Sequence, residues 1–269
     1  MSGFMNGRSE HEALGYRWLL KDSELVERNI ILNGVWEPES TAIVRRFLRP
    51  GDVFCDVGAN IGYYTLLAAQ IVGRRGRVVA VEAMAEPAAI LAANVFLNGL
   101  SPWVTLLPFA LADRPRLAGD GTPFHYSCPW PAAAEDRRVH PVTYVTLDSI
   151  AAAGALPELS FLKVDTDGYE AHVLRGGRYT LEQQRPLVLV EVGDWTLRHA
   201  AGIPEEGYTY GTATREMLAL LTACGYRLYR EDTLAPVSAD ELLAAYPLDR
   251  STTNVFAVPE ERRAEVSLP

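Results

Sequence analysis

Short apolar runs alternate with segments of helical periodicity along most of this chain, and this alternation restricts its fold more than any other feature. The first run, residues 53–57, is followed by a glycine-rich turn and by apolar residues at helical spacing. Further runs occupy residues 78–82, 104–110, 161–165 and 187–191. Continuous apolar strands suit a parallel sheet that is covered on both faces, so the pattern predicts an α/β fold built on such a sheet.

The end of the chain departs from this alternation. Residues 226–230 and 253–258 both have the composition of strands, and a short helical pattern at 239–245 lies between them. A late pair of strands predicts an antiparallel edge on an otherwise parallel sheet.

Three segments are expected outside this sheet. Residues 1–50 precede the first strand, and we expect a helical segment there that acts as a lid. The main domain is expected at 51–259, with a tail at 260–269. Within the domain, residues 114–142 are rich in proline and aromatic residues, and such a long insertion is predicted to face the substrate.

Composition excludes several classes of function. The chain has 269 residues, and 25 Lys and Arg against 34 Asp and Glu give a formal charge of −9, which disfavours general binding to nucleic acid. No apolar run approaches the roughly 20 residues of a membrane-spanning helix, and the first residues do not have the pattern of a signal peptide. Three widely spaced cysteines, Cys55, Cys128 and Cys224, predict neither disulfides nor a zinc site, so a cytoplasmic protein is expected.

The turn after the first strand is the first candidate binding element. Gly58 allows the backbone to approach a ligand, and Gly62 allows close packing at the start of the following helix. Glu82 ends the second strand, where an acidic side chain can accept hydrogen bonds from the two hydroxyls of a ribose. The alternatives are a turn without a ligand and a carboxylate that is simply solvated.

The spacing in this turn bears on the identity of the cofactor. A dinucleotide site usually has G-x-G-x-x-G, whereas this turn has G-x-x-x-G with Asn60 in its middle and Asp56 at its start. A carboxylate repels a pyrophosphate and attracts an ammonium group, so S-adenosylmethionine, which has no phosphate, fits better than NAD. Capping of its own turn is the alternative role for Asp56.

Acidic residues also follow the fourth strand. Asp165 ends this strand and could orient or deprotonate an acceptor hydroxyl, and Asp167 could share that role or cap the next helix. His125, in the aromatic insertion, is a second candidate base. Together with Glu191, the two aspartates could bind Mg²⁺, but no fixed ligand motif favours a metal, and we predict none.

Four motifs together resemble the FkbM-like family of S-adenosylmethionine-dependent O-methyltransferases over about residues 28–258: WEPEST at 36–41, DVGANIGYYT at 56–65, VEAMAEP at 81–87 and LKVDTDGYEAHVLRGG at 162–177. The resemblance implies a class I, Rossmann-like methyltransferase sheet of seven mostly parallel strands with an antiparallel last strand. It implies cofactor contacts at Asp56, Gly58, Ala59, Asn60, Gly62, Glu82 and Ala83, with the adenine near Ala110 and Leu111. The chain departs from the family where Asp167 replaces the usual glutamate and where Ala83 replaces a proline.

These observations predict methyl transfer to a hydroxyl of a sugar or a polyketide-like natural product. The reaction is expected to proceed by in-line displacement, assisted by a carboxylate or by His125. Three alternatives remain open: an NAD-dependent oxidoreductase on a similar sheet, a catalytically inactive cofactor-binding protein, and a transferase that depends on a divalent metal.

Overall fold

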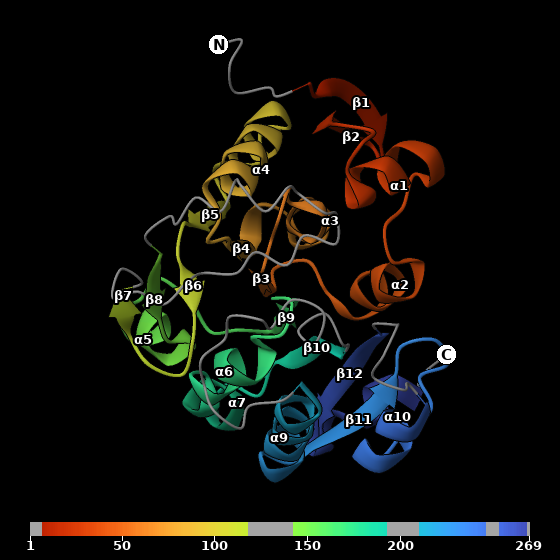
Figure 1. Ribbon diagram of the computed structural model, residues 1–269, viewed down its shortest axis with the longest axis vertical. Coiled ribbons are helices and arrows are strands. Elements are labelled where there is room, and N and C mark those ends of the chain that lie inside the picture. The colour runs from red at the N-terminus through yellow and green to blue at the C-terminus, as the bar shows by residue number, and fades with distance from the viewer. Residues whose placement is uncertain (1–6, 118–141, 193–209, 246–252, 268–269) are drawn as a thin grey trace. The chain divides into compact units, whose positions relative to one another are not determined.

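The computed structural model describes residues 7–117, 142–192, 210–245 and 253–267 (Figure 1). Contacts along the chain divide it into two compact units, residues 1–108 and 109–269. None of the helices in the described part of the chain has both the length and the apolar character needed to cross a bilayer.

The first unit holds the glycine-rich turn. Its elements are β1 (Ser9–Ala13), β2 (Tyr16–Leu20), α1 (Leu25–Asn33), α2 (Pro38–Phe47), β3 (Val53–Val57), α3 (Tyr63–Val72), η1 (Gly73–Arg75), β4 (Arg77–Val81), α4 (Ala85–Leu97) and β5 (Val104–Leu107). Strands β3, β4 and β5 are parallel and adjacent in that order, with Asp56 opposite Ala80 and Val81 opposite Leu107. Because the turns after β3 and β4 leave the same edge of these strands, they come close together.

The second unit contains the acidic motif. Its elements are β6 (Ala110–Leu111), β7 (Arg116–Leu117), β8 (Thr143–Val145), α5 (Leu147–Ala152), β9 (Phe161–Val164), α6 (Glu170–Arg175), α7 (Arg178–Gln183), β10 (Leu187–Val192), α9 (Tyr210–Ala223), β11 (Tyr226–Arg230), α10 (Ala239–Ala245), β12 (Thr253–Pro259), η2 (Glu260–Arg262) and α11 (Ala264–Ser267). Strand β9 is parallel to β10, and β12 lies between β10 and β11, antiparallel to both.

The predicted fold class is confirmed. Strands β3, β4 and β5 of the first unit and β9, β10, β11 and β12 of the second are the strands of a seven-stranded, mostly parallel sheet. The one antiparallel strand, β12, is the last in the sequence. Buried apolar side chains such as Phe54, Leu162 and Val190 line these strands, as expected for strands covered on both faces.

Two predicted boundaries are wrong. The third strand ends at Leu107 rather than at 110, because Pro108 has no N–H to donate and ends the strand. Ala110 and Leu111 form β6, which pairs with β8 in a separate three-stranded sheet. In the sequence, Pro87 predicts the start of the helix after the second strand, but this helix begins at Ala85, since a proline is tolerated anywhere in the first turn.

The N-terminal segment, expected to be helical, also contains a hairpin. Strands β1 and β2 pair antiparallel, and α1 and α2 follow them. Burial alternates along β2, with Tyr16, Trp18 and Leu20 buried and Arg17 exposed, so one face of the hairpin is covered.

Gly62, at the start of α3, is required by both its conformation and its packing. Its φ is +97°, in the region that favours glycine, and a Cβ at this position would lie 2.4 Å from Leu91 Cδ1 on α4. Leu91 is fully buried and has little room to move. Close approach of α3 and α4 therefore depends on this glycine.

Replacing Gly62 by alanine is expected to destabilise the protein by about 2–4 kcal/mol, from backbone strain and from overpacking against Leu91. Gly99→Ala is the matched control, because Gly99 also has a positive φ, of +66°, but has no heavy atom within 4 Å of an added Cβ. Its expected cost is about 1 kcal/mol. Urea unfolding measures the free energy of unfolding of both variants, and an equal decrease in the two would contradict the packing argument.

Candidate functional site

The turn between β3 and α3, residues 58–62, is named the donor loop here, after the methyl donor that the sequence predicts for it. Gly58 and Gly62 have φ of 79° and 97°, and Asn60 between them has φ of 49°. The N–H groups of Gly58 and Ala59 both donate to Val81 O, at 3.0 and 3.1 Å, and Gly62 N–H donates to Ala59 O. The donor loop is thus folded tightly onto the end of β4.

Glu82 anchors the middle of the donor loop. Its Oε2 accepts from Asn60 N–H at 2.8 Å, and its Oε1 accepts from Met84 N–H at 2.7 Å. Glu82 is 8% exposed, and this burial raises the pKa of its carboxyl above the ordinary glutamate value despite the two N–H donors. Each oxygen keeps lone-pair capacity for another donor, as the predicted contact with ribose hydroxyls requires.

Asp56 lies beneath the donor loop. It is 1% exposed, and its Oδ2 accepts from Thr65 Oγ1, in the first turn of α3, at 2.6 Å. The carboxylate therefore binds a side chain of the helix that follows its turn, whereas the alternative considered for it was to cap the turn itself. Ala83, beside Glu82, is partly exposed.

In the second unit, a buried cation accompanies the acidic motif. Lys163 points from β9 and is 2% exposed, and its Nζ donates to Asp165 Oδ2 at 2.7 Å. The Asp165 side chain is 25% exposed, so one side of this ion pair faces solvent. An amine on an otherwise apolar strand is the signal that could have identified Lys163 from the sequence.

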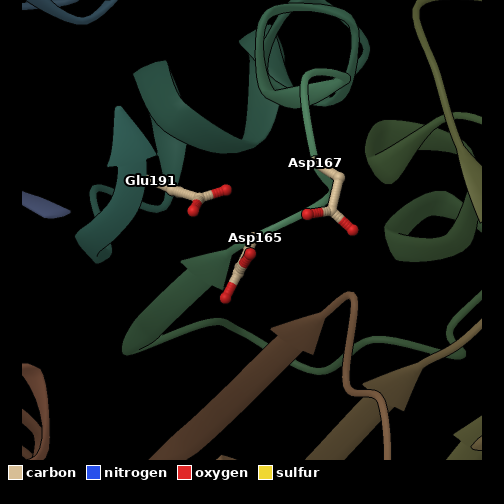
Figure 2. Close-up of side chains that lie close together, drawn as sticks. All are labelled: Asp165, Asp167 and Glu191. Atoms are coloured by element: carbon tan, nitrogen blue, oxygen red, sulfur yellow. The ribbon is translucent and has the colours of Figure 1, made fainter. Parts of the chain in front are cut away.

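The three acidic residues considered for a metal do come together. Asp165, Asp167 and Glu191 each place a carboxylate oxygen within 4.8 Å of the others (Figure 2). Oxygen atoms in this arrangement could bind Mg²⁺. Lys163 already supplies one positive charge to this cluster.

Glu170 stabilises the turn that carries the cluster. Its Oε1 accepts from Thr166 N–H at 2.8 Å, from Thr166 Oγ1 at 3.0 Å and from Gly168 N–H at 3.1 Å. Burial raises the pKa of its carboxyl. These bonds hold the turn in which Asp167 adopts a φ of 52°. Glu170 is therefore an acidic side chain that holds the backbone of this turn.

The remaining predicted residues contribute less. Leu111 is buried and Ala110 partly exposed, both in β6. His125 lies outside the described residues, as does most of the predicted insertion. His172 is buried on α6, with its Nδ1 2.8 Å from Arg175 Nη2.

Replacing Lys163 by methionine is expected to destabilise the protein by about 2 kcal/mol at pH 8, because the carboxylates of the cluster lose their buried counter-charge. Adding Asp165→Asn should restore part of the stability, because the carboxylate bound to Lys163 is then neutral. Urea unfolding at pH 8 measures both variants, and a double variant no more stable than Lys163→Met would show that Lys163 acts only by packing.

A scan against family models matches residues 56–228 to the methyltransferase FkbM domain. A probable cobalt-precorrin-6B C(15)-methyltransferase (decarboxylating) of Pyrobaculum calidifontis is 30% identical over 155 residues, which are 54% of this chain and 80% of that protein.

Among solved structures, an O-methyltransferase from Bacillus cereus in complex with SAH matches with a TM-score of 0.48 and 15% identity, covering 86% of this chain and 85% of that one. Methyltransferase FkbM from Methylobacillus flagellatus matches with a TM-score of 0.46 and 13% identity over 81% of this chain, which spans half the length of that protein. Because the family model matches residues 56–228, which are more than half of the chain, the chain belongs to the FkbM family of S-adenosylmethionine-dependent methyltransferases.

Proposed function

We propose that this protein transfers a methyl group from S-adenosylmethionine to a hydroxyl of a small molecule, a sugar or another natural product. The donor is bound by the donor loop and Glu82, and Asp165 accepts the proton of the hydroxyl. The observation that carries the proposal is the buried Glu82 carboxylate at the end of β4, held by two N–H groups beside the donor loop.

The hydrogen bonds of the donor loop favour a ligand without phosphate. The N–H groups of Gly58, Ala59, Asn60 and Gly62 all donate within the chain, and Asn60 donates to a carboxylate. A pyrophosphate site needs free backbone donors directed at the anion. Asp56 and Glu82 also place two acidic groups at this edge, which suits a cationic ligand and opposes NAD.

The chemistry divides between the donor and the protein. When bound, S-adenosylmethionine supplies a methyl group made electrophilic by its sulfonium. Glu82 accepts hydrogen bonds from the ribose hydroxyls and so fixes the orientation of the methyl donor. Asp165 orients the acceptor oxygen and takes its proton. Lys163 keeps Asp165 in place through their hydrogen bond. His125 is the alternative base.

A carbon acceptor is the second candidate. The relative from Pyrobaculum calidifontis is named for methylation at a carbon, C(15), with decarboxylation. The two candidates differ in the product, because an oxygen acceptor gives a methyl ether and a carbon acceptor gives a new carbon–carbon bond.

Binding of S-adenosylhomocysteine should weaken as the pH is lowered through the raised pKa of Glu82, because the protonated carboxyl loses acceptor capacity. The stability of the ligand-free protein should change in the opposite sense. A carboxyl with a raised pKa in the folded state binds more protons there, so its contribution to the free energy of unfolding falls as the pH rises through the same range.

Glu82→Gln should weaken binding by about tenfold or more at pH 8, from the loss of charge-assisted hydrogen bonds, and should remove this pH dependence. Glu39→Gln, at an exposed position on α2, is the control with the same chemical change. Calorimetric titration between pH 5 and pH 8 measures both. Wild-type affinity retained in Glu82→Gln would refute the role of Glu82.

A screen of sugars, macrolides and corrin precursors with ¹³C-methyl donor tests the acceptor. Mass spectrometry detects the transferred methyl, and NMR distinguishes a methyl ether from a carbon-bound methyl. Asp165→Asn should lower turnover of the active substrate about 10²–10⁴-fold, as expected for the loss of a general base, while donor affinity changes less than about threefold. A carbon-bound product, or full turnover in Asp165→Asn, would contradict the proposal.

A further inference from the structure

Asn94 of α4 and Asn98, which caps the C-terminal end of this helix, cover the outer edge of the hairpin strand β2. Asn98 Oδ1 accepts from Arg17 N–H at 2.9 Å, and Asn98 Nδ2 donates to Arg17 O at 2.7 Å. One helical turn earlier, Asn94 Oδ1 accepts from Leu19 N–H at 2.8 Å. Two residues of a strand advance about 6.6 Å and four residues of a helix about 6 Å, so the two spacings match. The amides take the place of a neighbouring strand.

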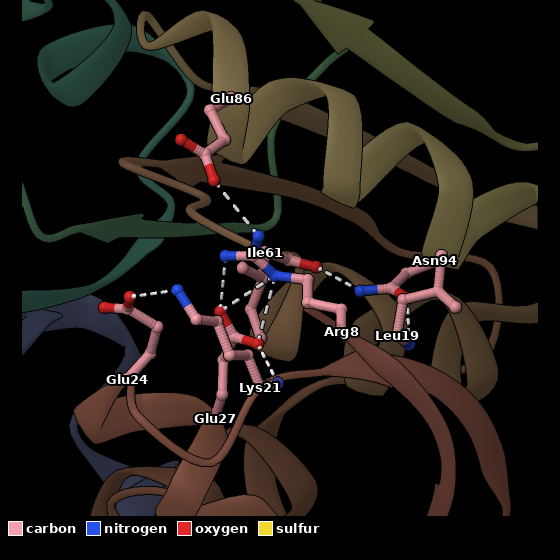
Figure 3. Close-up of polar contacts among 8 residues, drawn as sticks. All are labelled: Arg8, Leu19, Lys21, Glu24, Glu27, Ile61, Glu86 and Asn94. Carbon is pink, nitrogen blue, oxygen red and sulfur yellow. Dashed lines mark hydrogen bonds and ion pairs between the residues drawn. The ribbon is translucent and has the colours of Figure 1, made fainter. Parts of the chain in front are cut away.

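Asn94 differs from Asn98 in what its amide reaches on the other side. Its Nδ2 donates to the carbonyl oxygen of Ile61, in the donor loop, at 2.9 Å (Figure 3). Asn94 is 0% exposed, so neither of these hydrogen bonds can be replaced by one to solvent. A flip of the amide would break both, since its oxygen and its nitrogen each have one assigned partner. The hairpin and the donor loop are thus joined through a single side chain.

Arg8 forms a second attachment of this N-terminal segment. Its guanidinium donates to both oxygens of Glu27, with the shortest contact at 2.8 Å, and to Glu86 on α4 at 3.1 Å (Figure 3). The side chains of Arg8 and Glu27 are 6% and 3% exposed, so this ion pair is buried. It attaches the start of the hairpin to α1 and to the first turn of α4, which holds the hairpin against the face that carries Asn94.

We propose that Asn94 is a positioning residue for the methyl donor. Its amide couples the edge of the N-terminal hairpin to the Ile61 carbonyl and thereby fixes the conformation in which the donor loop binds S-adenosylmethionine. The inference rests on the proposed function, because it takes residues 58–62 as the donor site.

The contacts explain why this carbonyl needs a partner. Gly58, Ala59 and Asn60 are held through their N–H groups by the end of β4 and by Glu82. Ile61 is 3% exposed, so its carbonyl would lose a buried hydrogen bond without the Asn94 amide. The second half of the donor loop would then be tied to the first half by the bond from Gly62 N–H to Ala59 O, with one support fewer. A ligand that contacts both halves would have to restore part of their alignment.

The test compares matched variants of the two asparagines. Asn94→Asp keeps the acceptor for Leu19 N–H and loses the donor for the Ile61 carbonyl, and Asn94→Leu loses both. Asn98→Asp and Asn98→Leu are the corresponding changes one turn away, where the amide bonds to Arg17 of the same hairpin and to the Asn94 carbonyl instead of to the donor loop. Calorimetric titration of the 269-residue chain with S-adenosylhomocysteine at pH 8 gives the affinities, and thermal unfolding gives the stabilities.

Both Asn94 variants are expected to bind S-adenosylhomocysteine about tenfold or more weakly than the wild type, and both Asn98 variants within about threefold. Lowering the pH adds a readout that a purely structural role would not move. A buried aspartic acid has a raised pKa, and once protonated it can donate to the Ile61 carbonyl. The ratio of dissociation constants between Asn94→Asp and the wild type should therefore shrink as the pH falls, whereas the ratio for Asn94→Leu should stay constant.

Each alternative result has a distinct meaning. If Glu82→Gln weakens binding and the Asn94 variants do not, the inference fails while the proposed donor site stands. If Glu82→Gln has no effect, residues 58–62 are not the donor site, and both fail. Equal losses of affinity for S-adenosylhomocysteine in the Asn94 and Asn98 variants would show that the hairpin affects binding and the contact with Ile61 does not. This result would also overturn the inference. If Asn94→Asp does not fold, Asn94→Leu against Asn98→Leu decides the matter.

Discussion

The hydrogen bonds of the Glu82 carboxylate are the interaction on which the rest of the proposed donor site depends. Glu82 accepts one N–H from Asn60 and one from Met84, and so ties the donor loop to the turn that starts α4. Because the carboxylate is buried, these bonds are made in a medium that strengthens them. The same burial raises the pKa of the carboxyl, so a group that organises the backbone is also sensitive to pH.

Two further buried charges, on Arg8 and Lys163, are each paired within their own unit. Arg8 and Glu27 bind each other in the N-terminal segment, and Lys163 binds Asp165 at the end of β9. A buried charge is costly without a partner, so loss of either residue of a pair affects the position of the other. For Asp165, this means that a lysine sets the orientation of the proposed base.

The sequence predicted the strands of the sheet well and the supports of the donor site poorly. Residues 53–57, 226–230 and 239–245 form elements with the predicted bounds, because their local composition and periodicity are strong. The hairpin strand Ser9–Ala13 is polar, and it forms because Tyr16–Leu20 pairs with it, so no local pattern indicated it. The third strand was predicted too long because its apolar run continues past the proline that ends it.

Individual site residues also divide into those with a local signal in the sequence and those that depend on distant partners. Glycines and acidic residues at strand ends stand out in a sequence, so the donor loop, Glu82 and the gathering of Asp165, Asp167 and Glu191 could be predicted. Asn94 has its partners 75 and 33 residues away, in Leu19 and Ile61. Its signal was a polar residue among the apolar positions of α4, which shows that a partner exists but not which one.

A crystal structure of the protein soaked with S-adenosylhomocysteine tests the central claim most directly. The account predicts that the nucleoside lies against residues 58–62, with its ribose hydroxyls within hydrogen-bonding distance of the Glu82 carboxylate. A nucleoside bound elsewhere, with no contact to Glu82, would contradict it.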